Sequence, residues 1–277
     1  DEGTSATGIN ITPGALSGVT VSRSNSTVGN NTGTATVTFT NTNPIPASGD
    51  IRIVFPAGFD VTGAASPTST VITGAETIAA VDAVNRTVDI NIAGALSAGT
   101  NVNDLVLSGI KNPTTAGMTG TFTVQTQNAT DAVIDEGTSA TGINITPGAL
   151  SGASVTLLTS STAGAVGSVR TDFTTSNTIP VDGKIVITFP SAAGFVFSSG
   201  AATAATSATI DGTLTVSIAA SVLTITRSGG TVSAVEAKSI TLTNIKNPTV
   251  AGPSGSFQFK TTNTGGVTID ENASVTE

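Results

Sequence analysis

The side chains available for chemistry in this chain are carboxylates, amines and hydroxyls. The 277 residues include no Cys, His, Trp or Tyr, so thiol chemistry, the commonest general base and the commonest transition-metal ligand are all missing. Carboxylates such as Asp82 and Asp89 could serve glycoside hydrolysis, but the second half of the chain has no matching pair, and no Tyr or Trp could stack on a sugar. The sequence therefore predicts that the protein is not an enzyme and has no catalytic residue.

Three carboxylates near the middle of the chain, Asp131, Asp135 and Glu136, are the best candidates for binding a metal ion. Ca²⁺ binds carboxylate and carbonyl oxygens, but a calcium loop places its acidic residues at alternate positions. That spacing is absent here, so a solvated acidic turn is the favoured interpretation. We expect no cofactor and no bound metal.

The composition narrows the class of partner. The formal charge is −8, the isoelectric point is about 4.4, only 10% of residues are charged and the mean hydropathy is +0.27. Nucleic acid is excluded because its binding needs a basic surface. No run approaches the roughly 20 apolar residues that span a bilayer. Asp1 and Glu2 do not resemble a signal peptide, so we expect the chain to begin after any processing or to be part of a longer protein.

The chain is an internal repeat with a period of 134 to 135 residues. Its opening segment, DEGTSATGINITPGALSG at residues 1–18, returns without a change at residues 135–152, although the other matching segments have drifted. The drifted segments keep their order and spacing: Asn43–Pro56 matches Asn177–Pro190, Ile110–Gly117 matches Ile245–Gly252, and Gly120–Glu136 matches Gly255–Glu271. The sequence therefore predicts two tandem domains, residues 1–134 and 135–277. Residues 1–18 are a possible donated or linker strand, and residues 135–152 are the predicted junction strand.

Strand patterns dominate both repeats. Thr34–Thr40 alternates, with Val37 and Phe39 on one face, and other short segments rich in Thr, Val and Ile are bounded by Gly, Pro, Asn or Asp. Ala75–Val84 comes closest to a helical period, but a strand or loop fits it equally well. Seven to nine short strands per repeat predict an all-β fold of two β-sandwiches. Eight phenylalanines are expected to fill the cores: Phe39, Phe55, Phe59, Phe122, Phe173, Phe189, Phe195 and Phe257.

Two stretches carry a resemblance to a known class. They are Asn43–Phe59 (NPIPASGDIRIVFPAGF) and Ile110–Phe122 (IKNPTTAGMTGTF), each with its match in the second repeat. They resemble the tandem immunoglobulin-like repeats of large secreted and cell-surface microbial proteins, some of which build extracellular fibrils and pilus-like filaments. The resemblance implies an immunoglobulin-like sandwich, an extracellular or cell-surface location, and an adhesive or filament-forming role. The second repeat departs from the pattern by one inserted residue within Ser191–Phe197, which changes a loop.

The identical segment suggests how copies of the chain could join. If Gly142–Thr146 pairs with an edge of the first repeat, residues 1–18 have the same chemistry but no preceding repeat in their own chain. They would then donate a strand to the second repeat of another copy, which gives head-to-tail assembly into a fibril. A non-polymerising adhesin or surface-layer stalk is the alternative function, and gene conversion is the alternative reason for the identity. The predicted interface residues are Ile9, Ile11 and Leu16 with their matches Ile143, Ile145 and Leu150.

Glycans are the other predicted feature of the surface. A surface with so few charges would gain solubility from sugars, and cell-surface or matrix glycans are candidate partners besides the chain itself. The Asn-X-Ser/Thr motif also arises by chance in a chain rich in Asn and Thr, so ordinary polar residues are the alternative. The motif occurs at Asn10, Asn25, Asn30, Asn85, Asn128, Asn144 and Asn272.

Overall fold

The structure is a computed structural model that describes residues 9–197 and 202–275. It confirms the prediction of an all-β chain: within these residues the only helix is the single 3₁₀ turn η1 (Ser191–Ala193). The ambiguous segment Ala75–Val84 forms a strand, β6 (Glu76–Asp82). Among the described residues there is no helix with the length and hydropathy needed to cross a membrane.

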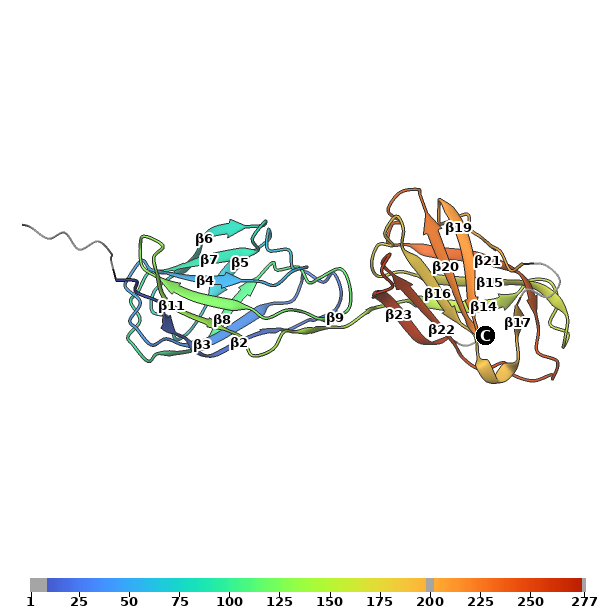
Figure 1. Ribbon diagram of the computed structural model, residues 1–277, viewed down its shortest axis with the longest axis horizontal. Coiled ribbons are helices and arrows are strands. Elements are labelled where there is room, and N and C mark those ends of the chain that lie inside the picture. Colours follow the sequence, from blue (N-terminus) through green and yellow to red (C-terminus); the bar gives the residue numbers. More distant parts are fainter. Residues whose placement is uncertain (1–8, 198–201, 276–277) are drawn as a thin grey trace, which may run out of the picture. The chain divides into compact units, whose positions relative to one another are not determined.

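The described chain divides into two compact units. The first unit comprises residues 9–26, 30–113 and 118–144, and the second comprises 27–29, 114–117, 145–197 and 202–275. Each unit contains one six-stranded sheet and one smaller sheet, with the same order of matching strands (Figure 1).

The strands of the first unit form two sheets. The six-stranded sheet has the order β1 (Gly14–Ala15), β11 (Val133–Thr138), β10 (Thr123–Gln127), β4 (Asp50–Val54), β7 (Thr87–Ile92) and β6. The four-stranded sheet has the order β2 (Ser17–Arg23), β3 (Ala35–Thr40), β8 (Asn101–Ser108) and β5 (Ala65–Thr68). Two further strands, β9 (Gly117–Met118) and β12 (Asn144–Ile145), pair with each other.

The second unit repeats this arrangement. Its six-stranded sheet has the order β13 (Gly148–Ala149), β23 (Thr268–Val275), β22 (Phe257–Thr262), β16 (Lys184–Thr188), β20 (Val222–Ser228) and β19 (Thr213–Ala219). The other sheet has the order β14 (Ser151–Leu157), β15 (Val166–Thr174), β21 (Ala237–Lys246) and β17 (Val196–Phe197), and β18 (Ala205–Thr206) also pairs with β21.

Each unit is a sandwich because both of its sheets contribute to one core. In the second unit, Ile185, Ile225 and Phe259 of the six-stranded sheet share a buried cluster with Val169 and Leu242 of the other sheet. In the first unit, the alternation of β3 buries Val37 and Phe39, as the sequence pattern predicts. All eight phenylalanines expected in the cores are buried or packed against a buried cluster.

Phenylalanine rings pack against one another in each sandwich. In the first unit the ring centroids of Phe55, Phe59 and Phe122 lie 5.5 to 5.6 Å apart. In the second unit Phe189 lies 5.0 Å from Phe257 and 5.2 Å from Phe195, both with edge-to-face rings. These three rings of the second unit line part of the candidate site described below.

The boundary expected at Asp135 falls inside a strand. β11 begins at Val133 and runs across it, so Asp135–Thr138 close the six-stranded sheet of the first unit by pairing with β10. The segment 135–152 is therefore not one junction strand. It comprises the last strand of one sandwich, a connection, and the first strands of the next, β13 and β14.

A buried arginine of the second unit pairs with a carboxylate at its surface. Arg227 is fully buried, pairs with the Asp211 carboxylate and donates to the carbonyl oxygen of Pro180. The backbone N–H of Thr231 and the Arg227 guanidinium together lower the pKa of Asp211 to about 2.

We therefore expect Asp211 to stabilise the second unit above pH 3.8, and this stabilisation to be lost as the pH falls through about 2. Asp211→Asn should remove that part of the pH dependence. Urea unfolding of the second unit at a series of pH values between about 5 and about 2 measures it, and identical profiles for the two proteins would contradict the prediction.

Candidate strand-docking site

The identical segment contributes the first strand of each sandwich, through Gly14 in its first copy and Gly148 in its second copy. Gly14 pairs in parallel with Asp135, and Gly148 pairs in parallel with Asp270 in the same way. A Cβ atom at either glycine would lie 2.2 Å from the Oδ1 atom of the paired aspartate. The first strand of each sandwich therefore requires glycine at the position that pairs with the aspartate of the last strand.

The paired aspartates hold the last strand of each sandwich in place. Asp135 is fully buried; its Oδ2 accepts from the backbone N–H groups of Thr42 (3.0 Å) and Asn43 (2.8 Å), and its Oδ1 accepts from Asn43 Nδ2 (2.6 Å). Asp270 makes the three matching contacts with Ser176 and Asn177. Burial raises the pKa of the Asp270 carboxyl, while these donors lower it. Because the folded pKa is raised, the contribution of this group to stability falls as the pH rises through it.

Gly148→Ala is expected to destabilise the second unit by about 2 kcal/mol or more, because the added methyl group overlaps the buried Asp270–Asn177 contact. Gly265→Ala is a matched control, since its nearest neighbour, Asn263 Oδ1, lies 3.4 Å from the added Cβ. Denaturant unfolding of both variants measures the difference, and equal midpoints would contradict this explanation of the glycine.

The middle of the identical segment docks on the first unit. Ile143 N donates to Thr119 Oγ1 (2.9 Å), and Thr119 N donates to Ile143 O (2.9 Å). A Cβ atom at Gly142 would lie 2.1 Å from Thr119 O, so only glycine permits this approach. Ser139 completes the contact by exchanging hydrogen bonds with the backbone of the buried Phe122.

The same residues at the start of the chain have a different environment. Residues 1–8 lie outside the described residues, but Ile9 is 89% exposed and Ile11 is 83% exposed. Their matches are covered: Ile143 is half-buried and Ile145 is 2% exposed. One sequence is thus packed in one place and exposed in the other.

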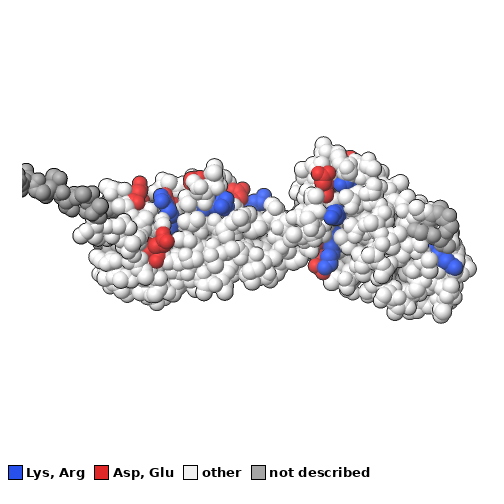
Figure 2. All heavy atoms as spheres, in the orientation of Figure 1, with Lys and Arg blue, Asp and Glu red and all other residues white. Residues whose placement is uncertain are grey.

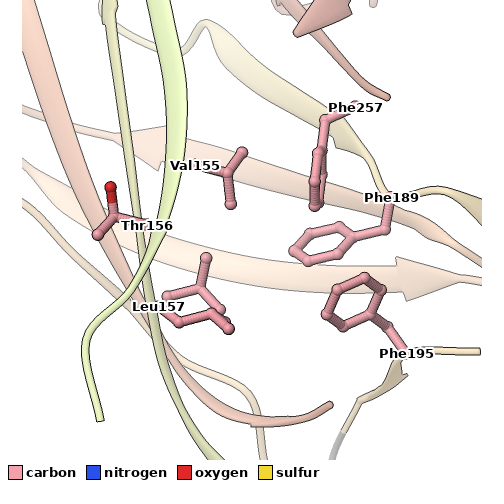
Figure 3. A pocket seen from close by; sticks show the side chains of 7 residues that line it. Val155, Thr156, Leu157, Phe189, Phe195 and Phe257 are labelled. Atoms are coloured by element: carbon pink, nitrogen blue, oxygen red, sulfur yellow. The ribbon is translucent and has the colours of Figure 1, made fainter. Parts of the chain in front are cut away.

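The second unit has a groove where the first unit receives Ile143. The match of Thr119 is Ser254, and a groove of about 180 Å³ lies beside it. A second hollow of about 240 Å³ lies next to the groove, and both are lined by Leu157 and Phe195. Phe189, Phe195 and Phe257 gather on one side of this hollow, across from Val155 and Leu157 (Figure 3). The groove is lined by Leu157, Ser161, Ala163, Phe195, Asn247, Pro248, Val250, Ala251, Gly252 and Ser254.

One of the replacements at this groove changes a charged side chain into an apolar one. In the first unit the matching position is Arg23, whose guanidinium reaches Ile110 O (2.6 Å) and Asn112 Oδ1 (3.0 Å). In the second unit that position is Leu157, which is 39% exposed. The second unit therefore presents an apolar side chain at the groove where the first unit has an arginine tied to its own backbone.

The electrostatics favour apolar and main-chain contacts. The chain has only 10 Lys and Arg and 18 Asp and Glu, and most of the face in Figure 2 carries no charge. The groove lining includes no charged residue. Its surface is suited to an uncharged strand with isoleucine side chains.

Three of the six predicted interface residues are buried within their own copy, and one of them is Ile145, which is 2% exposed. Leu16 is 7% exposed, and Leu150 belongs to the core cluster of the second unit. Their backbone N–H groups donate to Glu136 O and Glu271 O within their own sandwiches. Ile9 and Ile11 remain as the exposed pair. The groove beside Ser254 was not predicted, because no sequence motif marks it apart from the repeat itself.

Four of the five carboxylates considered for catalysis or metal binding have other partners, and the fifth, Asp131, is described in a later section. Asp89 pairs with Arg52 through two contacts of 2.7 and 2.8 Å, and Asp82 accepts from Asn85. Asp135 is occupied as described above, and Glu136 accepts from Gln125 Nε2. The described residues contain no group of three or more acidic side chains placed to hold a metal ion.

The candidate glycosylation sites differ in exposure. Asn10, Asn85 and Asn144 are exposed, whereas Asn25, Asn30, Asn128 and Asn272 are half-buried. The amide nitrogen of Asn272 donates to Leu150 O, so a sugar there would break a backbone contact. The exposed positions are the accessible ones.

Comparison with known proteins gives structural likenesses only. No protein-family model matches the chain, and no curated protein matches it in sequence. Among solved structures, a putative membrane-anchored protein of Corynebacterium diphtheriae is 13% identical (TM-score 0.31, 94% of this chain and 57% of that one). The N-terminal domain of the Streptococcus gordonii adhesin Sgo0707 is 12% identical (0.32, 88% and 60%). The collagen-binding domain of the Erysipelothrix rhusiopathiae surface protein RspB is 10% identical (0.26, 95% and 92%).

The chain thus spans less than two thirds of the first two of these structures. Their TM-scores are low, so the fold assignment rests on the strands and cores of this chain. The class that those strands define is a chain of β-sandwiches of immunoglobulin-like architecture.

Proposed function

We propose that this chain is a structural protomer of an extracellular microbial fibril that assembles head to tail. Residues Ile9–Thr12 of one copy dock in the groove beside Ser254 on the second unit of the next copy. The observation that carries this proposal is the contrast between Ile143 and Ile145, which are covered, and the identical Ile9 and Ile11, which are exposed. The location outside the cell rests on the composition and on the repeat motif.

The contact seen within the chain is the template for the contact between copies. Ile9 matches Ile143 and Ser254 matches Thr119, so Ile9 would lie along Ser254 as Ile143 lies along Thr119. Strand addition of this kind takes affinity from main-chain hydrogen bonds and specificity from alternate side chains. Burial of two isoleucines contributes about 3–6 kcal/mol before the cost of association.

The geometry of such a contact determines the product. The donor segment and the acceptor groove are different surfaces of the chain, so each copy can donate and accept at once. A heterologous contact of this type continues into a filament unless the rotation between copies closes a ring.

The test is the assembly state of the intact chain. Electron microscopy and sedimentation over a wide concentration range should reveal linear or ring-shaped assemblies that lengthen with concentration. A micromolar contact requires about 8 kcal/mol. A chain that stays monomeric up to about 1 mM would contradict the proposal and leave the non-polymerising adhesin or surface-layer stalk as the function.

A further inference from the structure

A polar row crosses the six-stranded sheet of the first unit, away from the strand-docking site. Gln127 of β10 pairs directly with Asp50 of β4, and Asp50 pairs directly with Asn91 of β7. Directly paired residues project to the same face of a sheet, so these three side chains lie side by side. Asn91 Nδ2 donates to Asp50 Oδ1 (2.8 Å).

A second carboxylate reaches this row from the hairpin between β10 and β11. Asp131 has a positive φ of 62°, and its carboxyl lies within hydrogen-bonding reach of the Asp50 carboxyl. Two carboxylates this close repel each other unless a proton or a cation lies between them. Burial, followed by the charges of Asp131 and Asp89, raises the pKa of Asp50. The neighbouring Arg52 is paired with Asp89.

Gln127 gives an independent indication of a ligand at this place. Its side chain is 0% exposed, and neither its Oε1 nor its Nε2 has a hydrogen-bond partner among the described residues. A buried amide without partners is costly, because each unsatisfied group loses its hydrogen bonds to water and gains none in return. Gln127 is the direct cross-strand neighbour of Asp50, and an amide oxygen together with two carboxylates is a ligand set that suits a hard cation.

We propose that the first unit binds a calcium ion through the carboxylates of Asp50 and Asp131 and the Oε1 atom of Gln127. Waters complete the coordination, because Ca²⁺ takes about six to eight oxygen ligands. The ion neutralises the two facing carboxylates and gives Gln127 Oε1 a partner. The sequence led us to expect no bound metal, so this proposal departs from that expectation. It does not depend on the proposed assembly.

The second unit has a different residue at each position that matches one of these three ligands. Lys184 stands at the position of Asp50, Thr262 at that of Gln127, and Gly266 at that of Asp131. Thr262 Oγ1 donates to Asn263 O, so its side chain has a partner. A lysine ammonium at the position of Asp50 supplies a positive charge of its own, so the predicted stoichiometry is one Ca²⁺ per chain.

The test is calcium titration of the full chain by calorimetry, with thermal unfolding in ~10 mM CaCl₂ and in EDTA. We expect one site per chain and a rise of a few degrees in the unfolding midpoint of the first unit, as for a weak extracellular calcium site. Asp131→Gly should abolish both effects. This variant should fold, because the second unit carries Gly266 there with a φ of +85°. Asp50→Asn should also abolish both effects, and Asp182→Asn should leave both unchanged.

Two results would overturn the proposal. Calcium binding that persists in both Asp50→Asn and Asp131→Gly would place the ion elsewhere. An absence of calcium binding would also overturn it. If the unfolding midpoint of the wild-type chain then rises on acidification and that of Asp131→Gly does not, Asp50 and Asp131 share a proton instead.

Discussion

Deletion of residues 1–12 is expected to abolish end-to-end assembly and to leave the unfolding of both units unchanged. Ile9 and Ile11 are exposed, and the described residues before Gly14 form no strand. A longer deletion through Gly18 is not equivalent, because it removes β1 and the buried Leu16 and would destabilise the first unit. Sedimentation of the shortened chain, with calorimetry to check its folding, measures the effect.

A point variant tests whether assembly needs the isoleucine side chain or only the presence of residues 1–12. Ile11→Asp should weaken assembly at least about tenfold, because a charged side chain would have to enter an uncharged groove. Val84→Asp is the matched control, since Val84 and Ile11 are both 83% exposed. If both variants, or the chain without residues 1–12, assemble as the intact chain does, the docking segment is wrong.

Asp135→Ala and Asp270→Ala are each expected to destabilise one unit by about 3 kcal/mol or more. Each substitution removes the acceptor for two backbone N–H groups and one asparagine amide, which are left without a partner beside the closing strand. Asp135→Ala should lower the stability of the first unit, and Asp270→Ala that of the second.

Glu136→Ala is the matched control on the same strand as Asp135. Its carboxylate is exposed and accepts from Gln125, so its loss should change the stability by less than about 1 kcal/mol. Chemical denaturation followed separately for the two units measures these effects. If Asp135→Ala and Glu136→Ala had the same small effect, the buried aspartate would not be what holds the closing strand.

The repeat and the alternation of apolar residues along the strands predicted most of the fold. The two-residue alternation of Thr34–Thr40 predicted that Val37 and Phe39 face the core, and both are buried in the structure. The boundary was misplaced because the identical segment reads as one block, whereas Asp135–Thr138 close one sandwich and Gly148 opens the next. Sequence identity cannot reveal that a repeated block has three structural roles.

The site was predicted only in part, for a similar reason. An apolar residue in a repeated block can fill a core or an interface, and Leu16 and Ile11 look alike until the register of β1 buries Leu16. The meeting of Asp50 with Gln127 had no sequence signal, because residues far apart in the chain are brought together by strand pairing.

Head-to-tail docking can be tested by disulfide trapping, because the chain has no cysteine of its own. A chain with Ile9→Cys is mixed with one carrying Ser254→Cys under mild oxidation, and disulfide-linked pairs are counted. A single chain with both Ile143→Cys and Thr119→Cys is the positive reference, because Ile143 and Thr119 are hydrogen-bonded neighbours.

We expect rapid formation of a disulfide between the substituted positions 9 and 254 of different copies, and none when Val84→Cys replaces Ile9→Cys. Equal linking from positions 9 and 84, or none from either, would contradict head-to-tail docking in this groove.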